Sequence, residues 1–288
     1  MEVVLSALVL GTIYALLAAG IVIVYKASRV VNFAHGELAI VGAYVFYSVS
    51  LMLPVDSLFL TIAVTALASA LFGFVIYLAL MRRLIGEPTF VAAIVTIGLA
   101  IVLKSTIVVF WKSRSVGLDI TRETLFHFGS RGQVTAMDAI TIMVGAAFFA
   151  LLFYFFHYTP FGRHFRGAAE NPLLASQRKV NVNLILSIAW ATAVFSAALA
   201  GVLFGTRSIL TPQSIVIGLS GLTAALVGGL DSLRGALLGG YLVAGASYAT
   251  ATLVDPALSE TVPFLLLLIV MTLRPWGLFG TREELDRV

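Results

Sequence analysis

Nine hydrophobic stretches, separated by short polar connections, make up most of the chain. They cover residues 3–25, 38–53, 57–81, 90–111, 136–159, 184–206, 214–230, 233–254 and 257–273. The stretches are rich in Leu, Ala and Val and interrupted by Gly, and none has the strict alternation of a membrane β-strand. A helix needs roughly 20 apolar residues to cross a hydrocarbon core about 30 Å thick. Because lipid offers no hydrogen bonds to an open backbone, each stretch is predicted to form a helix.

The composition fits a chain that lies mostly in lipid. Of the 288 residues, 60% are hydrophobic and 11% are charged, and the mean hydropathy is +1.04. A soluble domain usually carries about 25% charged residues. These values exclude a soluble enzyme and a nucleic-acid-binding protein, and the absence of cysteine excludes a disulfide scaffold. We expect an all-α polytopic membrane protein of about eight or nine transmembrane helices, with residues 1–288 forming a single transmembrane domain.

The basic residues indicate how the chain is oriented, because Lys and Arg accumulate in cytoplasmic connections. If all nine stretches cross and the N-terminus lies outside, most Lys and Arg fall in inner connections. The outer connections then hold only Lys112, Arg114, Arg122, Arg131 and Arg207. A re-entrant 214–230 would reverse everything after it and remove this asymmetry. The charges therefore favour an odd number of crossings, with the N-terminus outside and the C-terminus cytoplasmic.

Two connections are longer than turns, and such connections are the places to expect partners. Residues 112–135 form a predicted extracytoplasmic loop of mixed polarity, and residues 160–183 form a basic cytoplasmic segment. In the second, a short amphipathic stretch precedes Asn171–Pro172, which forces a turn and can restart a helix. One interpretation is an interfacial helix held on anionic lipid by Arg163 and Arg166. The other is a pair of docking helices for a cytosolic subunit.

The chain carries no recognisable energy source. None of its lysines follows a glycine, which excludes an ATP-binding P-loop, and no GxSxG, HExxH or paired-carboxylate pattern appears. The histidines have no metal-ligand spacing, so we predict neither a metal site nor a cofactor in this chain. Lys104 is the one charge well inside a stretch, and it either snorkels outward or contacts a substrate carboxylate in a pathway. Coupling to an ion gradient is therefore poorly supported.

Polar and small residues mark further places of interest. Asn32, His35 and Glu37 lie at the predicted inner mouth of the second stretch. There Asn32 would cap a helix and Glu37 would lie near its positive end, or His35 and Glu37 would serve in gating or at a subunit interface. Two GxxxG patterns, at 201–205 and 235–239, favour close helix crossings, within one bundle or between subunits.

The segment from Gly162 to Ala175 resembles the EAA-type coupling loop of permease subunits from branched-chain amino acid ATP-binding-cassette (ABC) importers. Three further stretches are similar to the same family: GTIYALLAAG at 11–20, VNFAHGEL at 31–38 and LRPWGLFG at 273–280. A glycine-rich block at 228–240 fits as well. The resemblance is to the first-permease type and runs in one order over nearly the whole chain.

This resemblance implies an ABC importer permease bundle that forms half of a translocation pathway in the inner membrane. It implies as partners a second related permease, two cytosolic ATPases that bind ATP and Mg, and an extracytoplasmic substrate-binding protein. A role in ATPase coupling is carried over to the matching loop residues Gly162, Arg163, Arg166, Ala169, Glu170, Asn171, Pro172 and Ala175. The gating or interface candidates are Asn32, His35, Glu37, Gly228, Gly229, Asp231 and Arg234.

Some positions depart from the family pattern, and the residues do not choose the substrate. Leu173 stands where an acid is common, Lys179 where a glycine is common, and Asp231 and Arg234 lie within the glycine-rich block. Branched-chain or related small amino acids are the expected substrates, and urea, short-chain amides or small carboxylates are the alternatives within the same architecture. A stand-alone channel or a secondary carrier is the alternative from another class. The coupling segment and the scarcity of charge inside the stretches argue against it.

Overall fold

The computed structural model describes residues 2–54, 57–112, 114–118, 120, 124–127, 133–170 and 172–281. The long helices are α1 (Glu2–Ser28), α2 (His35–Met52), α3 (Leu58–Ala79), α4 (Thr89–Trp111), α5 (Ala136–Tyr158), α8 (Val182–Gly205) and α10 (Leu233–Leu253). The shorter helices are α6 (Pro160–Glu170), α7 (Pro172–Gln177), α9 (Ile217–Gly228) and α11 (Val262–Leu273). Short 3-10 helices occupy Met81–Leu84, Pro212–Val216 and Pro256–Leu258. Strands β1 (Thr124–His127) and β2 (Gln133–Thr135) pair antiparallel.

Each of the nine predicted stretches contains a helix, so the prediction of an all-α polytopic membrane protein is confirmed. Helices α1, α3, α4, α5, α8 and α10 are long and apolar enough to cross a membrane by themselves. Helix α2 has 18 residues, whereas α9 and α11 have 12 each, which at 1.5 Å per residue gives about 18 Å. The α9 stretch is irregular, because the 3-10 helix 212–216 precedes the α-helix.

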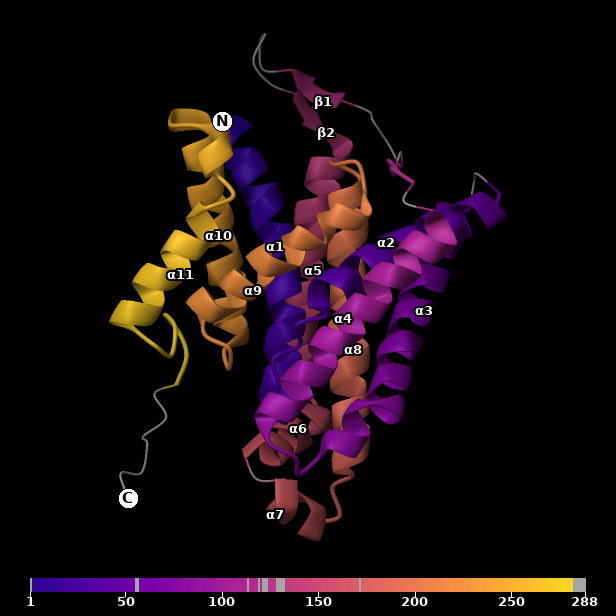
Figure 1. The fold of residues 1–288 in the computed structure, drawn as a ribbon, viewed down its shortest axis with the longest axis vertical. Helices are drawn as coiled ribbons and strands as arrows, with labels where there is room; N and C mark the ends of the chain where they lie inside the picture. The colour runs from indigo at the N-terminus through magenta and orange to yellow at the C-terminus, as the bar shows by residue number, and fades with distance from the viewer. Residues whose placement is uncertain are drawn as a thin grey trace.

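Helix α1 lies at the centre of the bundle. It packs against α5, α8, α9 and α10. In its most apolar 18-residue segment, 78% of the residues are buried, compared with 17% in the corresponding segment of α4. Figure 1 shows α2, α3 and α4 on one side of it and α9, α10 and α11 on the other. Gly11 faces the Tyr241 ring of α10, and Gly240 of α10 faces the backbone of Ala15. The small residues therefore let α10 pack closely against the buried helix α1.

The GxxxG patterns form helix contacts within the chain. A Cβ atom added at Gly201 of α8 would lie 2.0 Å from the carbonyl oxygen of Ala39 in α2. Gly235 and Gly239 of α10 face the backbone of Gly228 and Ala224 in α9. The spacing is therefore used for packing inside one bundle.

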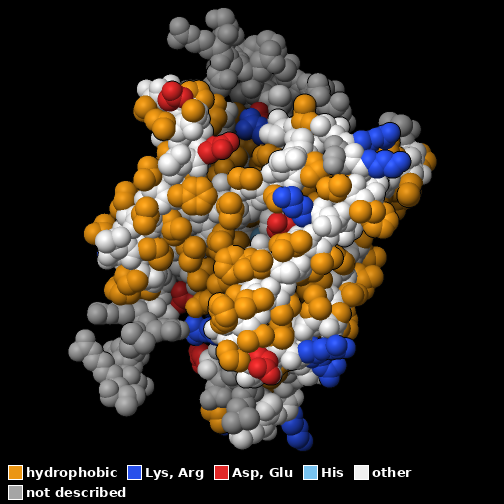
Figure 2. All heavy atoms as spheres, in the orientation of Figure 1, with side chains coloured by type: hydrophobic (Ala, Val, Ile, Leu, Met, Phe, Trp, Pro, Cys, Tyr) orange, Lys and Arg blue, Asp and Glu red, His pale blue; other side chains and the backbone are white. Residues whose placement is uncertain are grey.

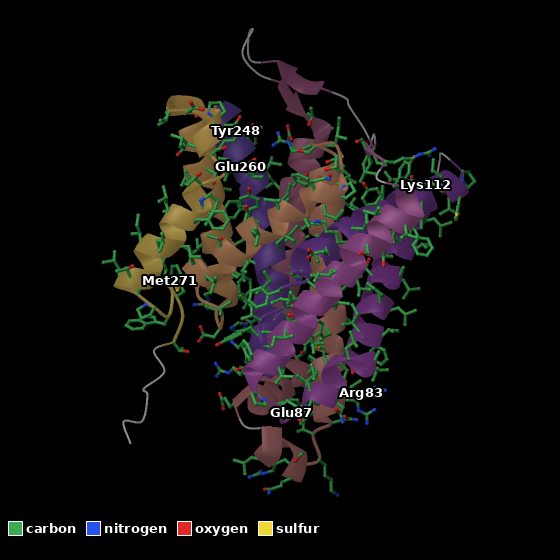
Figure 3. The ribbon with its side chains drawn as sticks, viewed as in Figure 1. Arg83, Glu87, Lys112, Tyr248, Glu260 and Met271 are labelled. Atoms are coloured by element: carbon green, nitrogen blue, oxygen red, sulfur yellow. The ribbon has the colours of Figure 1, made fainter. Side chains whose placement is uncertain are left out.

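The two long connections lie at opposite ends of the molecule. The N-terminus and the β1–β2 hairpin share one end, and α6 and α7 lie at the other (Figure 1). Figure 3 places Lys112 near the hairpin end and Arg83 near the α6–α7 end. The sequence did not predict the hairpin within 112–135. Of the outer basic residues, Arg122 and Arg131 lie outside the described residues.

The start of α5 is fixed by charge and capping. Thr135 and Asp138 form a reciprocal capping box, with the Asp138 backbone N–H donating to Thr135 Oγ1 and the Thr135 N–H donating to Asp138 Oδ2. Arg207, just after α8, lies 2.9 Å from Asp138 Oδ1, and the Asp138 side chain is buried. The pair joins the beginning of α5 to the end of α8 at the hairpin end of the bundle.

Candidate functional site

The predicted coupling segment, residues 160–183, folds as two short helices at one end of the bundle. Helix α6 ends at Glu170 and α7 begins at Pro172, which confirms the predicted helix restart. One face of α6, made of Gly162, Phe165 and Ala168, is buried. The remaining face carries exposed polar or small residues, namely Arg163, His164, Gly167 and Glu170. The segment thus presents charge outward while it packs against the bundle.

Helix α6 is anchored on the last turn of α5. Phe165 is buried edge-on against the ring of Phe156, with the ring centroids 4.7 Å apart. The Arg166 guanidinium donates a hydrogen bond to the Phe156 carbonyl oxygen. A Cβ atom added at Gly162 would lie 2.2 Å from that same oxygen, so only glycine allows this approach. Movement of α6 is therefore tied directly to α5.

The residues predicted for ATPase coupling take different places in this segment. Arg163 and Glu170 are exposed, and Arg166 is half-buried by its bond to α5. Ala175 is buried. Ala169 is only half-buried, and its neighbour Ala168, which the sequence analysis missed, is the buried alanine on α6. Pro172 is the first residue of α7, and Asn171 lies outside the described residues.

The backbone conformation of Lys179 explains how a lysine can stand where the family pattern has a glycine. Its φ angle is +60°, in the left-handed region where glycine is favoured. The backbone after α7 therefore keeps the conformation that a glycine would supply, although the side chain differs. The chain ends this segment with the Asn181 side chain accepting a hydrogen bond from the Leu184 N–H at the start of α8.

The glycine-rich turn between α9 and α10 packs against the C-terminal motif. Gly229 has φ +110° and Gly277 has φ +80°. A Cβ atom on Gly229 would meet the backbone of the C-terminal motif, and one on Gly277 would meet the backbone around Gly229. The N–H groups of Leu278 and Phe279 donate to the carbonyl oxygens of residues 227 and 228, both at 2.9 Å. Two motifs that are far apart in the sequence therefore form one unit.

Charged residues join this unit to the coupling segment. The Asp231 carboxylate accepts hydrogen bonds from the backbone N–H and the hydroxyl of Thr281. The Lys26 ammonium, near the end of α1, donates to the Asp231 carbonyl oxygen at 3.2 Å and interacts electrostatically with Arg166 and Glu170. Arg234, on the first turn of α10, is exposed. Lys26, near the end of α1, thus interacts both with α6 and with the α9–α10 turn.

The connection between α1 and α2 does not stay at the inner mouth, which corrects the prediction. Asn32 and His35 are each only 1% exposed. The His35 ring packs where a Cβ atom of Gly20 would be, eight residues before the end of α1 and thus about 12 Å along its axis. Asn32 does not cap α2 itself, because its Oδ1 accepts from the N–H of Ala34, the N-cap residue. A small glycine on α1 made room for this polar segment inside the bundle.

A central cavity of about 190 Å³ lies where the first turn of α2 meets the α9 stretch. Gly36 and Gly218 meet backbone to backbone there, a contact that the sequence analysis missed and that only two glycines allow. The polar residues lining this cavity are Asn32, His35 and Glu37. Glu37 also interacts electrostatically with Lys104 of α4. The structure therefore brings Lys104, which was predicted separately, within electrostatic range of the group Asn32, His35 and Glu37.

The face of the molecule drawn in Figure 2 is largely apolar but carries some charge. Figure 2 shows acidic and basic side chains next to each other near the middle of a largely apolar face, between α9 and α4 of Figure 1. Lys104 is exposed on α4, and Glu37 is half-buried. Lipid disfavours charge at such depth, so this face favours a protein partner or a water-filled pathway over bulk lipid.

A larger cavity of about 520 Å³ opens at the N-terminal end, which the sequence-based topology places outside, and is called the outer cavity below. Its polar lining includes Tyr14, Ser220, Tyr248 and Glu260. Figure 3 shows Tyr248 and Glu260 close to each other at that end. Val216 and Leu219 line both this outer cavity and the central cavity, so the two spaces are adjacent.

Comparison with known proteins matches this architecture to one family. The family model described as the branched-chain amino acid transport system, permease component, matches residues 3–271. The chain belongs to this family. It is 28% identical to the high-affinity branched-chain amino acid transport system permease protein LivH of Salmonella typhimurium, over 97% of this chain and 94% of that protein. It is 29% identical to the permease protein BraD of Pseudomonas aeruginosa, over 98% and 96%. No solved structure matches the chain.

Family membership defines the class of the molecule. It is a multi-pass membrane permease of the ABC importer type and is not itself an ATPase. A third relative, a probable branched-chain amino acid transport permease protein LivH from Methanocaldococcus jannaschii, is 25% identical over 96% of this chain and 91% of its own length. The matches therefore cover the bundle, the central cavity and α6–α7 together.

Proposed function

We propose that this permease forms half of the pathway of an ATP-driven importer for branched-chain or related small amino acids. The observation that carries the proposal is the α6–α7 pair, which is exposed on its charged face and anchored to α5 through Phe165 and Gly162. Such a helix pair transmits force from a cytosolic subunit into the bundle. The names of the relatives support the substrate class.

The proposed assembly contains a second related permease, two cytosolic ATPases that bind ATP and Mg, and an extracytoplasmic substrate-binding protein. The ATPases would dock on Arg163, Glu170 and the turn that follows. ATP binding would move α6 and, through Phe156, the whole of α5. Because α5 packs on the central helix α1, this movement reaches the cavities of the bundle.

We place the N-terminus outside and the C-terminus in the cytoplasm. The support is the excess of Lys and Arg on the α6–α7 side of the sequence-based topology. The chain has no cysteine, so Lys112→Cys and Arg83→Cys each create a single thiol at opposite ends. A membrane-impermeant maleimide added to intact cells should label Cys at 112 and spare Cys at 83. The reverse labelling would invert the orientation.

ATP-driven uptake tests the proposed function. The permease is reconstituted in liposomes with its three kinds of partner subunit from the same genome, and radiolabelled leucine is offered together with ATP inside or without it. We expect uptake that requires ATP and every partner, and no uptake by the permease alone. Transport by the permease alone would indicate a channel or carrier. ATP-driven uptake of urea or an amide, with none of leucine, would reject the substrate class.

A further inference from the structure

The central cavity has hydrogen-bonding groups that the chain itself does not use. Among the described residues, no partner exists for Asn32 Nδ2. The His35 ring lies beside the backbone of Leu17, but neither ring nitrogen makes a hydrogen bond of ordinary geometry within the described part of the chain. Both side chains line the cavity and are almost fully buried. An unpaired buried polar atom is unfavourable. A ligand that forms hydrogen bonds with these groups therefore removes this cost, which favours its binding.

The start of α2 adds a preference for negative charge. This helix of 18 residues begins at His35, and its N-cap residue Ala34 supplies no side-chain hydrogen bond. The first N–H groups of a helix lack partners within the helix and attract anions. In transporters, helix N-termini near the membrane midplane receive the carboxylate of a substrate. The Asn32 amide, the His35 ring and the α2 N-terminus therefore suit a carboxylate.

Glu37 supplies the complementary charge from the first turn of the same helix. It lines the same cavity, is half-buried, and interacts with the Lys104 ammonium. A zwitterion brings one charge of each sign to a place that already holds one of each, so the site stays neutral. The remaining wall is apolar and includes Ile21, Leu219 and Leu222. This surface fits an aliphatic side chain.

We propose that the central cavity binds the zwitterionic head group of a small aliphatic amino acid on its way through the permease. The carboxylate is held by Asn32, His35 and the α2 N-terminus, and the ammonium by Glu37. The inference rests on the proposed function, because the ligand is the transported substrate. The substrate arrives from the adjacent outer cavity past Val216 and Leu219, the residues that both cavities share.

The test measures binding of radiolabelled leucine to the purified importer complex in lipid nanodiscs, without the substrate-binding protein. Two competitors remove one charge each: 4-methylpentanoate lacks the ammonium, and isoamylamine lacks the carboxylate. We expect unlabelled leucine to compete at least about tenfold better than either, because each removes a charged hydrogen-bonding partner.

Two nearly isosteric variants address the two ends of the ligand. Asn32→Asp keeps the oxygen that accepts from Ala34 but replaces the free donor with a negative oxygen, and should weaken leucine binding about tenfold or more. Glu37→Gln should weaken leucine to a similar extent and let 4-methylpentanoate compete almost as well as leucine. The control is Asn183→Asp, an exposed position whose Oδ1 accepts from the Tyr77 hydroxyl, as an aspartate also would. Its leucine binding should be unchanged.

The outcomes separate this inference from the proposed function. If both variants, eluting as intact complexes with ATPase activity, bind leucine and reject 4-methylpentanoate like the wild type, the inference is overturned. ATP-driven leucine uptake by the wild type would then still support the proposed function. If the wild type shows no such uptake, both fail. If Asn32→Asp does not assemble, the competitor preference of Glu37→Gln alone decides.

Discussion

The α6–α7 end and the start of α2 both place polar residues at a break between helices, but their environments are opposite. Arg163 and Glu170 on α6 are exposed. Asn32, before α2, and His35, within it, are buried, and Asn32 Nδ2 and both His35 ring nitrogens have no hydrogen-bond partner among the described residues. Exposed charges are solvated and stay available to a protein partner, while buried unpaired groups stay unfavourable until a ligand arrives. This difference supports the proposed protein partner at the first region and the proposed small ligand at the second.

The strongest test of the α6 side uses two glycines of the same helix. Gly162→Ala forces a methyl group onto the Phe156 carbonyl oxygen, whereas Gly167→Ala adds one in open space. Overpacking of this kind costs about 1–3 kcal/mol, which is enough to shift α6. We expect ATP-driven uptake to fall about tenfold or more in Gly162→Ala. Equal uptake by the two variants would show that the α6–α5 contact does not transmit movement.

Charge reversal at the exposed end of α6 is expected to have the next largest effect. Glu170→Lys should weaken ATPase docking by about 1 kcal/mol or more in binding free energy. ATP-driven uptake should then fall several-fold, while basal ATPase activity continues. The control Glu87→Lys makes the same change on an exposed residue at the same end, outside α6–α7 (Figure 3). ATPase and uptake rates measured on the same liposomes distinguish loss of coupling from loss of assembly. A similar loss in both variants would argue for a general electrostatic effect.

At the buried site, leucine binding is expected to depend on the space around the His35 ring. Gly20→Ala places a methyl group 2.5 Å from the His35 ring and must displace it. Gly98→Ala in α4 meets nothing within 4 Å and serves as the matched control. We expect leucine binding to the complex to weaken several-fold, by about 1 kcal/mol, only in Gly20→Ala. Unchanged binding in Gly20→Ala would mean that the ring position does not matter to the ligand.

The smallest effect is expected at Lys104. It is exposed and acts on the cavity only through the Glu37 charge, so Lys104→Gln should change leucine affinity about two- to fivefold, the size typical of exposed ion pairs. Lys112→Gln makes the same change at the end of the same helix and should have no effect. High salt should reduce the difference between the Lys104 variant and the wild type, since screening weakens exposed pairs. A difference that persists in high salt would place Lys104 in direct contact with substrate.

The sequence was sufficient for the helices and for the break between α6 and α7 because their signals are local. Apolar length gives a helix in lipid, and the Asn-Pro step gave the break between α6 and α7. The central cavity depends on contacts between residues far apart in the chain, such as Gly20 with His35 and Gly36 with Gly218. Local propensity placed Asn32 and His35 at a helix start and could not show that this start is folded into the bundle. The β1–β2 hairpin was missed because its strands are only four and three residues long.

Photocrosslinking from one position tests most directly whether α6–α7 receives the ATPase. Because the permease has no cysteine, Glu170→Cys labelled with a benzophenone maleimide carries its probe at one known place. In the assembled importer, illumination should link the permease to an ATPase subunit, with a yield that changes when ATP is bound, while the probe at Arg83→Cys should not give this product. If Cys at 170 forms no ATPase adduct in a complex that transports leucine with ATP, the coupling assignment is wrong.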